Sequence, residues 1–398
     1  MGKLQPKLRF PEFKDEWINL SLKDCANFHN NKRIPLKDSE RNKLEKVYPY
    51  YGASGIIDYV DNYLFDGEFI LLGEDGANIL TRSSRLVFIA KGKFWVNNHA
   101  HVFCAKNNFN NYFLSESLEK IDYSKYNSGT AQPKLNSKVV SGLPLNVPSL
   151  QEQTKIAEFL GYVDKQLELL NTKKEKLSLY KKGVMQQLFS QQLRFKEDNG
   201  NNYPKWEEKI LGEVATSFNG LTGKTAKDFG EGKKYIQYKQ IFDKPYINID
   251  DCGLVKIAKN EKQNQCKIGD VFFTVSSETK EEIGMSSVLE TTTNLTVYLN
   301  SFCFGVRFKD NVLIPQFSRF YFRNQYFRKN VIVLAQGSTR FNLSKINFMK
   351  LKITIPTIEE QVKIANFLSA IDKQIETLET EITKTEVYKK GLLQQMFV

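Results

Sequence analysis

The sequence has few cysteines and no long hydrophobic run. Its five cysteines (Cys25, Cys104, Cys252, Cys266 and Cys303) are scattered and form no CxxC motif, which argues against a disulfide framework and against a zinc site. The opening segment MGKLQPKLRFPEFKDEW lacks the apolar core of a signal peptide, and no apolar stretch reaches transmembrane length. We therefore expect a cytoplasmic protein of a reducing compartment, with no membrane partner.

Motifs that carry enzymatic chemistry are also missing or incomplete. The segment NGLTGKT at 219–225 resembles the end of a phosphate-binding loop, but Phe218 stands where that loop requires glycine. His99 and His101 would share one strand face, and two converging ligands are too few for a metal centre. His29, the only other histidine, is distant in sequence. We expect no metal, no cofactor and no catalytic residue in this chain.

One pattern leaves an enzymatic alternative open. The segment DVFFTVSSETK places Asp270, Glu278 and Lys280 at the spacing of a nuclease core, in which carboxylates hold a metal ion and the lysine lies beside the attacking water. A buried strand followed by a charged loop would give the same pattern, and the first half of the chain has no counterpart. The alternative function is therefore a stand-alone, Mg-dependent DNA endonuclease.

Positive charge is what the sequence has in excess. Lysine and arginine number 57 against 45 aspartates and glutamates, so the net charge is +12 at pH 7. This favours a polyanionic partner, nucleic acid before a membrane, although a soluble protein with a basic surface would look the same. Hydrophobic residues make up 41% of the chain, which is enough to form hydrophobic cores. Its 398 residues are more than a single hydrophobic core usually supports. We expect two or more folded units.

A duplication organises the chain. Residues 148–189 and 356–397 align without a gap, and 22 of the 42 pairs are identical. The match begins with PSLQEQTKIAEFL and PTIEEQVKIANFL and ends with YKKGVMQQLF and YKKGLLQQMF. A weaker repeat opens each half, where Trp17 and Trp206 are each followed five residues later by leucine. Such self-similarity indicates one structural unit written twice.

The segments between the repeats differ from each other. The blocks at about 25–128 and 215–336 do not align, although both contain strand-like runs broken by glycine-rich turns. We therefore expect the α+β class, with two domains of mixed structure that are each followed by a long helix. The four parts are residues 1–149, 150–190, 191–357 and 358–398. This pattern suits two readers of different targets on one scaffold.

The repeated helices carry apolar residues on the 4-3-4-3 spacing of a coiled-coil seam. Lys174, Lys181, Thr385 and Lys389 interrupt this ladder. In a parallel pair Lys181 would lie against Lys389, whereas in an antiparallel pair every polar position faces an apolar one, along which a lysine stem can lie. We therefore expect an antiparallel coiled coil with internal two-fold symmetry. The predicted seam residues are Ile156, Leu160, Val163, Leu167, Leu170, Leu177, Ile364, Leu368, Ile371, Ile375, Leu378 and Ile382.

Two amphipathic helices that pack separately onto their own domains are the alternative to this pair. If the helices do pair, the ladder of 32 residue steps would span about 48 Å. One turn of B-DNA measures about 34–36 Å. A rod of this length could hold two DNA-reading domains at a fixed distance.

Several loops have the composition of DNA-contacting surfaces, in which Lys and Arg bind phosphates and Asn, Gln, Glu and Arg read base edges. The repeated segments SGTAQPKLN and QGSTRFNLS both precede the last strand before a helix, although a shared structural turn explains them equally well. The candidate DNA-binding residues are Lys32, Arg33, Tyr51, Ser54, Glu74, Asp75, Asn97, Asn98, His99, Thr130, Gln132, Lys134, Lys224, Lys227, Tyr238, Lys239, Ser276, Ser277, Ser338 and Arg340.

The whole chain resembles the specificity subunits of Type I restriction-modification enzymes. The resemblance is carried by the two helix starts quoted above, by the DKQ that follows each start, and by the two YKKG helix ends. The opening LRFPEFKDEW and the block FNGLTGKTAKDFGEGKKYIQYKQI are also similar to segments of that family.

The resemblance implies a DNA-reading subunit with no activity of its own. Each target-recognition domain would read one half of a bipartite site in double-stranded DNA, across an unread spacer. The paired helices would set that spacing and hold two modification subunits. Those partners would bind S-adenosylmethionine and methylate adenine, and restriction subunits would add ATP- and Mg-dependent translocation and cleavage.

Overall fold

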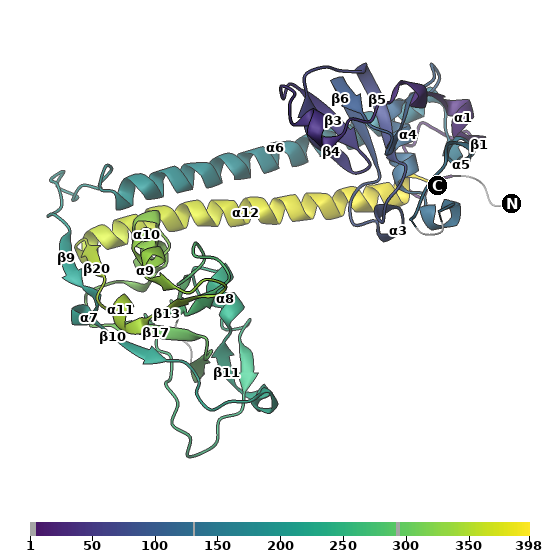
Figure 1. The fold of residues 1–398 in the computed structure, drawn as a ribbon. Helices are drawn as coiled ribbons and strands as arrows, with labels where there is room; N and C mark the ends of the chain where they lie inside the picture. The colour runs from purple at the N-terminus through teal and green to yellow at the C-terminus, as the bar shows by residue number, and fades with distance from the viewer. Residues whose placement is uncertain (1–4, 130–131, 292–294) are drawn as a thin grey trace. The chain divides into compact units, whose positions relative to one another are not determined.

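The computed structural model describes residues 5–129, 132–291 and 295–398, and the chain divides into two compact units. Unit 1 comprises Met1–Thr172 with Thr380–Val398, and unit 2 comprises Lys173–Glu379. The long helices α6 (Leu150–Phe189) and α12 (Ile358–Met396) each contribute a segment to both units (Figure 1). Each unit therefore combines a β-rich domain with part of each long helix.

The β-rich domain of unit 1 is built on one six-stranded sheet. Its strands are antiparallel except for one parallel pair, β3 with β6. In sheet order they are β2 (Ala26–Phe28), β7 (Ala100–Ala105), β5 (Phe65–Gly73), β6 (Val87–Val96), β3 (Tyr48–Gly52) and β4 (Gly55–Val60). The central run Ile70, Leu71 and Leu72 is fully buried, and its alternate side chains enter two different cores. A strand covered on both faces explains this unbroken apolar sequence.

Short helices and one strand pair complete unit 1. β1 (Ile18–Ser21) pairs antiparallel with β8 (Pro144–Val147). The helices are α1 (Leu22–Cys25), η1 (Asn30–Lys32), α2 (Asp38–Arg41), α3 (Asn78–Thr81), α4 (Asn111–Glu119), η2 (Tyr123–Tyr126) and α5 (Ser137–Ser141). The side chain of Asn110 accepts the Phe113 N–H and so caps α4, whose apolar face packs into the core that also receives α6.

The β-rich domain of unit 2 has a different sheet arrangement. An antiparallel four-stranded sheet has the order β10 (Ala215–Asn219), β17 (Cys303–Phe308), β13 (Val271–Thr274) and β15 (Ser286–Val288). A second sheet contains β12 (Gly253–Val255), β11 (Phe229–Ile236) and β16 (Val297–Leu299), and a third contains β14 (Ser276–Ser277), β19 (Phe341–Leu343) and β18 (Ala335–Gln336). The helices are α7 (Leu211–Val214), η3 (Ala226–Asp228), α8 (Tyr238–Asp243), α9 (Pro315–Tyr321), α10 (Gln325–Val333) and α11 (Lys345–Phe348).

The internal repeat is visible as a common frame in the two units. β9 (Glu207–Ile210) pairs antiparallel with β20 (Lys352–Ile355), as β1 pairs with β8. A four-residue helix follows the first strand of each pair, α1 in unit 1 and α7 in unit 2. A short helix also precedes the second strand of each pair, α5 or α11. The frame is therefore shared, and the sheets inserted into it differ.

A buried glutamate fastens the frame to the start of each long helix. In unit 1 the Glu152 carboxylate accepts hydrogen bonds from Arg9 Nε at 2.7 Å, Arg9 Nη2 at 2.8 Å and Trp17 Nε1 at 3.3 Å. In unit 2 Glu360 accepts from Arg194 and Trp206 in the same way, at 2.6–3.1 Å. Both carboxylates are buried. We call each set of three residues a glutamate anchor.

The glutamine after each glutamate makes a second matched contact. Gln153 Oε1 accepts the N–H of Asn110 and its Nε2 donates to the Pro148 carbonyl, at 3.0 and 2.9 Å. Gln361 makes the same pair of bonds with Ile314 and Pro356, at 2.9 and 3.0 Å. Asn110 and Ile314 precede the first residues of α4 and α9. The repeated EQ dipeptide therefore connects each long helix to the β-rich domain of its unit.

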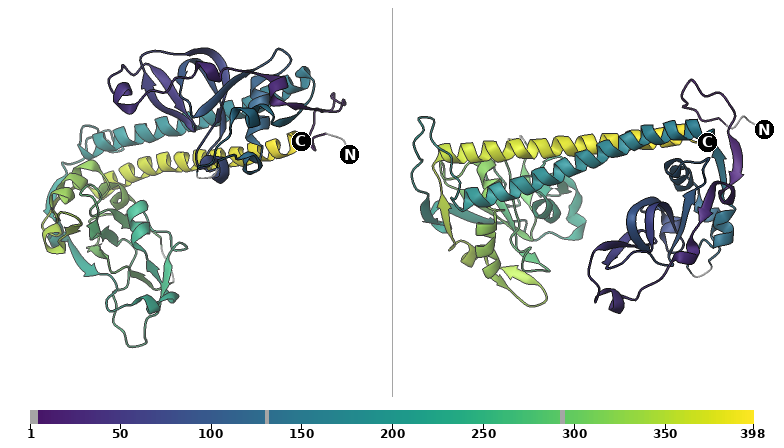
Figure 2. Two further views of the ribbon diagram at one scale, coloured as in Figure 1. Left: turned by 45° about the vertical axis from the view of Figure 1, so that its right-hand side comes forward. Right: turned by 90° about the horizontal axis from the view of Figure 1, so that it is seen from above.

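The long helices pair antiparallel within each unit (Figure 2). In unit 2 the Lys181 ammonium forms an ion pair with Asp372. In unit 1 Lys389 Nζ lies 2.5 Å from Asp164 Oδ1. Lys181 and Lys389 are equivalent in the repeat, as are the two aspartates of the DKQ segments. The α+β class and the long helices are thus confirmed, whereas coiled-coil packing stays a prediction.

The predicted seam residues are all buried or half-buried. Ile156, Leu160 and Val163 share the unit 1 core with Leu392 and Met396. In the unit 2 core, α6 residues Val184, Leu188 and Phe189 accompany the α12 seam residues Ile364, Leu368 and Ile371. Leu378 and Ile382 are buried, and Leu167, Leu170, Leu177 and Ile375 are half-buried. The seam lysines differ from expectation in one respect, because their ammonium groups are bound by carboxylates instead of being freed to solvent. Lys181 and Lys389 pair with aspartates, and Lys174 pairs with Glu379 at 2.9 Å.

We predict that Glu360→Gln destabilises unit 2 by about 2–3 kcal/mol, because it removes the charge that the part-buried Arg194 pairs with. The shift of the urea unfolding midpoint of the full chain measures this loss. Glu359→Gln is the matched control, since this neighbouring side chain is exposed, and its effect should stay within about 0.5 kcal/mol. Equal effects of the two variants would contradict the anchor.

Candidate nucleic-acid interface

In unit 1 a half-buried glutamate joins three loops that carry candidate residues. Glu74 follows β5, and its carboxylate lies 2.7 Å from Arg33 Nη1 and 3.3 Å from Lys134 Nζ. Its backbone N–H donates to the His99 carbonyl at 2.8 Å, and its own carbonyl accepts the Leu135 N–H at 2.7 Å. Burial raises the pKa of Glu74, but the opposing effect of Arg33 and its other cationic neighbours is larger and leaves it below its usual value. The carboxylate therefore stays ionised and holds the loops together.

The turn between β6 and β7 presents the next candidates. Asn97 is buried, its N–H donates to the Tyr51 carbonyl at 3.1 Å, and its Oδ1 accepts the His99 N–H at 2.8 Å. Asn98 and His99 are exposed at the tip of this turn. Ser54 is exposed in the β3–β4 turn. Asn97 therefore shapes the turn, while its neighbours are accessible to a ligand.

His101 lies in β7 and is fully buried, so it does not accompany the exposed His99. Its Nε2 lies 2.7 Å from the Leu135 carbonyl, and its Nδ1 lies 3.0 Å from Asn30 Nδ2. Burial lowers the pKa of His101, which favours a neutral ring that donates to Leu135. Asn30, which sequence reasoning missed, therefore helps to position the turn before α5.

Each of the two repeated turns contains a glycine whose position leaves no room for a side chain. A Cβ on Gly129 would lie 1.8 Å from the Gln132 carbonyl oxygen, and one on Gly337 would lie 2.2 Å from that of Arg340. Only glycine fits such an approach. Gln132, Ser338 and Arg340 are exposed on these turns, whereas Thr130 lies outside the described residues. The structural and functional explanations of the repeated segments are thus compatible.

In unit 2 several candidates gather around the small sheet of β14, β19 and β18. Tyr238 Oη donates to the Ser276 carbonyl at 2.6 Å. Ser276 and Ser277 are buried in β14, opposite Asn342 and Phe341 of β19. Ser338 and Arg340 occupy the exposed connection between β18 and β19. The serines hold this hairpin in place, and the hairpin presents the accessible groups.

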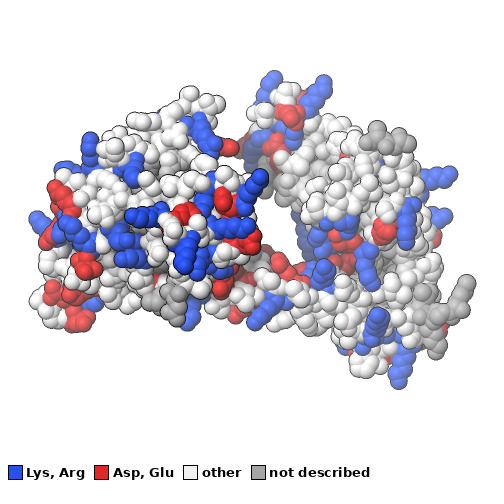
Figure 3. Space-filling model, turned by 90° about the horizontal axis from the view of Figure 1, so that it is seen from below, with Lys and Arg blue, Asp and Glu red and all other residues white. Residues whose placement is uncertain are grey.

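The remaining candidates stand apart from these clusters. Lys224 pairs with Glu261 at 2.6 Å in the loop before η3. Lys227, Lys239 and Lys32 are exposed. Figure 3 shows lysine and arginine side chains on the visible surface of both units, interspersed with acidic side chains. On this face, basic side chains that could contact phosphates are therefore present on both units.

The endonuclease alternative is not supported. Asp270 is fully buried and receives Arg307 Nε at 2.7 Å and Nη2 at 2.6 Å. The Lys280 ammonium lies over the Phe341 ring, 5.5 Å from its centroid. No group of three potential metal-ligating side chains occurs among the described residues. The DVFFTVSSETK pattern is a buried strand with a charged loop.

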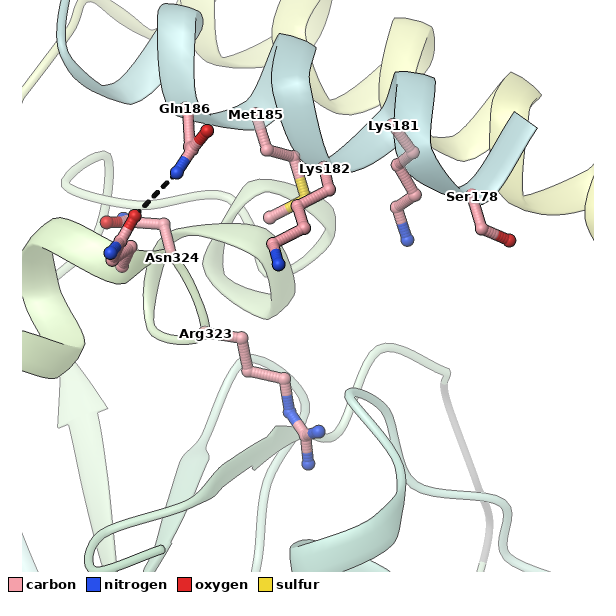
Figure 4. A pocket seen from close by; sticks show the side chains of 8 residues that line it. Ser178, Lys181, Lys182, Met185, Gln186, Arg323 and Asn324 are labelled. Carbon is pink, nitrogen blue, oxygen red and sulfur yellow. Dashed lines mark hydrogen bonds between the residues drawn. The ribbon is translucent and has the colours of Figure 1, made fainter. Parts of the chain in front are cut away.

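A cavity of about 420 Å³ lies in unit 2 between α6 and the start of α10 (Figure 4). Lys181, Lys182 and Met185 line its helical side, and Arg323 lines the other. Gln186 Nε2 donates to Gln325 Oε1 across one end at 2.6 Å. Arg323 donates to four backbone carbonyls at 2.7–3.0 Å. The arginine therefore supports neighbouring loops rather than a ligand.

Comparison with known families places these features in context. The family described as the Type I restriction modification DNA specificity domain matches residues 14–179 and 203–386. The chain belongs to this family. Both halves of this specificity subunit match, which agrees with the duplicated frame.

Named relatives agree with this assignment. The Type I restriction enzyme MjaVIII specificity subunit of Methanocaldococcus jannaschii is 24% identical over 409 residues, covering 97% of this chain and 92% of that protein. The specificity subunit S.HindORF215P of Haemophilus influenzae is 39% identical over 145 residues, 36% of each chain. The aligned part thus spans about a third of that second relative.

Solved structures share the fold. The Type I restriction-modification S subunit from M. genitalium has a TM-score of 0.61 at 15% identity, with 99% of both chains covered. A chain from a study of complex assembly and conformational transition in the type I R-M system has a TM-score of 0.54 at 16% identity, covering 100% of this chain and 98% of that one. No helix within the described ranges is long and apolar enough to span a membrane.

Proposed function

We propose that this specificity subunit reads a bipartite site in double-stranded DNA, with one recognition domain for each half-site. The observation that carries the proposal is the shared frame with different inserts. The same glutamate anchor holds a six-stranded sheet in unit 1 and a four-stranded sheet with two smaller ones in unit 2. Two different surfaces, each carried by the same repeated frame, suit two different half-sites.

In each unit, the exposed turn before the last frame helix is the proposed centre of the DNA contact. Gln132 in unit 1 and Arg340 in unit 2 occupy equivalent places on these turns. Glutamine pairs with adenine and arginine with guanine in the major groove, while the scattered lysines would bind phosphates. Specificity would then come from a few side chains, each worth about 1–3 kcal/mol of discrimination.

We further propose that the long helices dock two modification subunits. Leu179 and Tyr180 on α6 are 68% and 53% exposed, and the equivalent Val387 and Tyr388 on α12 are 66% and 54% exposed. Large apolar side chains on a helix surface mark a contact for another protein. A partner that fits one copy of this dipeptide fits the other, which gives two sites.

The chemistry of the complex would belong to those partners. Modification subunits would supply S-adenosylmethionine and methylate adenine, and restriction subunits would supply ATP- and Mg-dependent translocation and cleavage. The chain itself would be a non-catalytic, cytoplasmic component. The buried, ion-paired Asp270 supports this division of labour, because it removes one of the two candidate catalytic carboxylates, Asp270 and Glu278, from reach of DNA.

We predict that Arg340→Ala changes only one half of the methylated motif. Mapping of methylated adenines in genomic DNA from cells that carry the subunit and its partners should show a bipartite motif with an unread spacer. The variant should relax one position of one half-site and leave the other half-site and the spacer unchanged. Lys205→Ala, at another exposed position of unit 2, is the charge-matched control. A motif without two separable halves would contradict the proposal.

We predict that Tyr180→Ala and Tyr388→Ala each remove one modification subunit from the complex. Truncation of an interface tyrosine that contributes about 2 kcal/mol would weaken one site about 30-fold. Native mass spectrometry should show one bound copy for each single variant and none for the double variant. Tyr162→Ala is the control, because Tyr162 is 63% exposed on α6 but corresponds to Ala370 in the repeat. Full occupancy in the double variant would contradict the docking site.

A further inference from the structure

His99 of unit 1 is exposed, yet hydrogen bonds hold both its ring and its backbone in place. The His99 side chain is 51% exposed, yet its Nδ1 lies 2.8 Å from Asp75 Oδ2 and 3.0 Å from Asp75 Oδ1. The His99 N–H donates to Asn97 Oδ1 and its carbonyl accepts the Glu74 N–H, both at 2.8 Å. Ring and backbone are therefore both fixed.

The carboxylate partner determines which ring nitrogen is open. A carboxylate accepts hydrogen bonds, so the shared proton of His99 resides on Nδ1. Nε2 then carries the lone pair in the neutral ring, and it has no hydrogen-bond partner within residues 5–129, 132–291 and 295–398. In the neutral ring, Nε2 is therefore a preoriented hydrogen-bond acceptor on the side of the ring away from Asp75.

The contact between His99 and Asp75 contributes little to the stability of the fold. An ion pair or hydrogen bond at an exposed position adds little to the free energy of unfolding. A side chain that is already ordered loses less freedom when a ligand binds. The arrangement is therefore better suited to recognition than to folding.

The neighbourhood indicates the ligand. Gln132, Lys134 and Asn98 belong to the loops that Glu74 and the Asp75–Lys134 bridge bring together. In the major groove adenine N6 and cytosine N4 donate hydrogen bonds, whereas guanine O6 and thymine O4 accept them. A fixed acceptor can therefore distinguish an amino-bearing base from a keto-bearing base on the contacted strand.

We propose that His99 reads the amino group of an adenine or cytosine in the half-site bound by unit 1, and that Asp75 is its positioning residue. This inference rests on the proposed function of the recognition domains. It names the chemical class of one base, adenine or cytosine against guanine or thymine, at one position of the motif.

The test uses the full chain with its modification subunits and a DNA library in which every position of the first half-site is randomised. In the wild type, one position should favour adenine or cytosine over guanine or thymine, and His99→Ala should reduce that preference about 5- to 100-fold. Asp75→Asn should relax the same position, because an amide can either donate to Nδ1 or accept from it and no longer fixes the open nitrogen as an acceptor. All other positions and the second half-site should keep their preferences.

Two controls separate recognition from folding. Asp61→Asn removes the same charge from an exposed position of the β4–β5 loop and should change no preference. Asp75→Glu keeps the carboxylate and should retain part of the discrimination. A purely structural role of Asp75 would weaken all positions of the half-site together.

The outcomes separate the role of His99 from the proposed function of the whole chain. Unchanged base preferences in His99→Ala, with a wild type that shows two half-sites, would overturn the role of His99 alone. A wild-type complex without any sequence preference would overturn the proposed function as well.

Discussion

The buried carboxylate at the start of each long helix is the contact on which the rest of the structure depends. Glu152 and Glu360 each bind an arginine and a tryptophan from the segment that precedes the recognition domain. Burying a carboxylate is unfavourable unless hydrogen bonds and an opposite charge compensate. The geometry at this joint is therefore narrowly defined. The adjacent glutamines add two hydrogen bonds each, and together these contacts fix the direction in which a helix leaves its domain.

A rigid joint allows the inserted sheets to change without altering the helices. Unit 1 and unit 2 share the strand pairs, the short helices and the EQ contacts, but their sheets differ in strand number and order. The proposed DNA contacts lie on the inserts and on the turns that face them. The Lys181–Asp372 and Lys389–Asp164 ion pairs repeat the same contact where the helices meet in each unit. In the proposed function, specificity would then vary in one unit independently of the spacing between the half-sites.

The repeat and its helices could be predicted because they are local or self-similar in sequence. Apolar spacing predicted both long helices, and the clash between Lys181 and Lys389 predicted the antiparallel direction. The aspartate partners of those lysines were missed because only the apolar seam was considered. Had the DKQ segments been included, the charge complementarity between the two repeats would have given them.

The candidate site was predicted less completely because its geometry comes from long-range contacts. The partner of Asp270 is Arg307, 37 residues later, so a local match to a nuclease core could not show that the carboxylate is buried. Asn97, Ser276 and Ser277 are polar residues of the types that contact DNA, but they are buried. The sheet order and the contacts that join loops around Glu74 are made between segments far apart in sequence. The spacing of apolar residues along the chain does not predict such contacts.

The proposed function requires two recognition domains that read DNA at a distance set by the long helices. Its most direct test inserts seven residues into α6 after Thr172 and seven into α12 after Glu379, where the two units divide. This lengthens each helix by about 10 Å, or about three base pairs at roughly 3.4 Å per step. Mapping of methylated adenines should give the same two half-sites with a spacer about three base pairs longer. An unchanged spacer, or altered half-sites, would contradict the account.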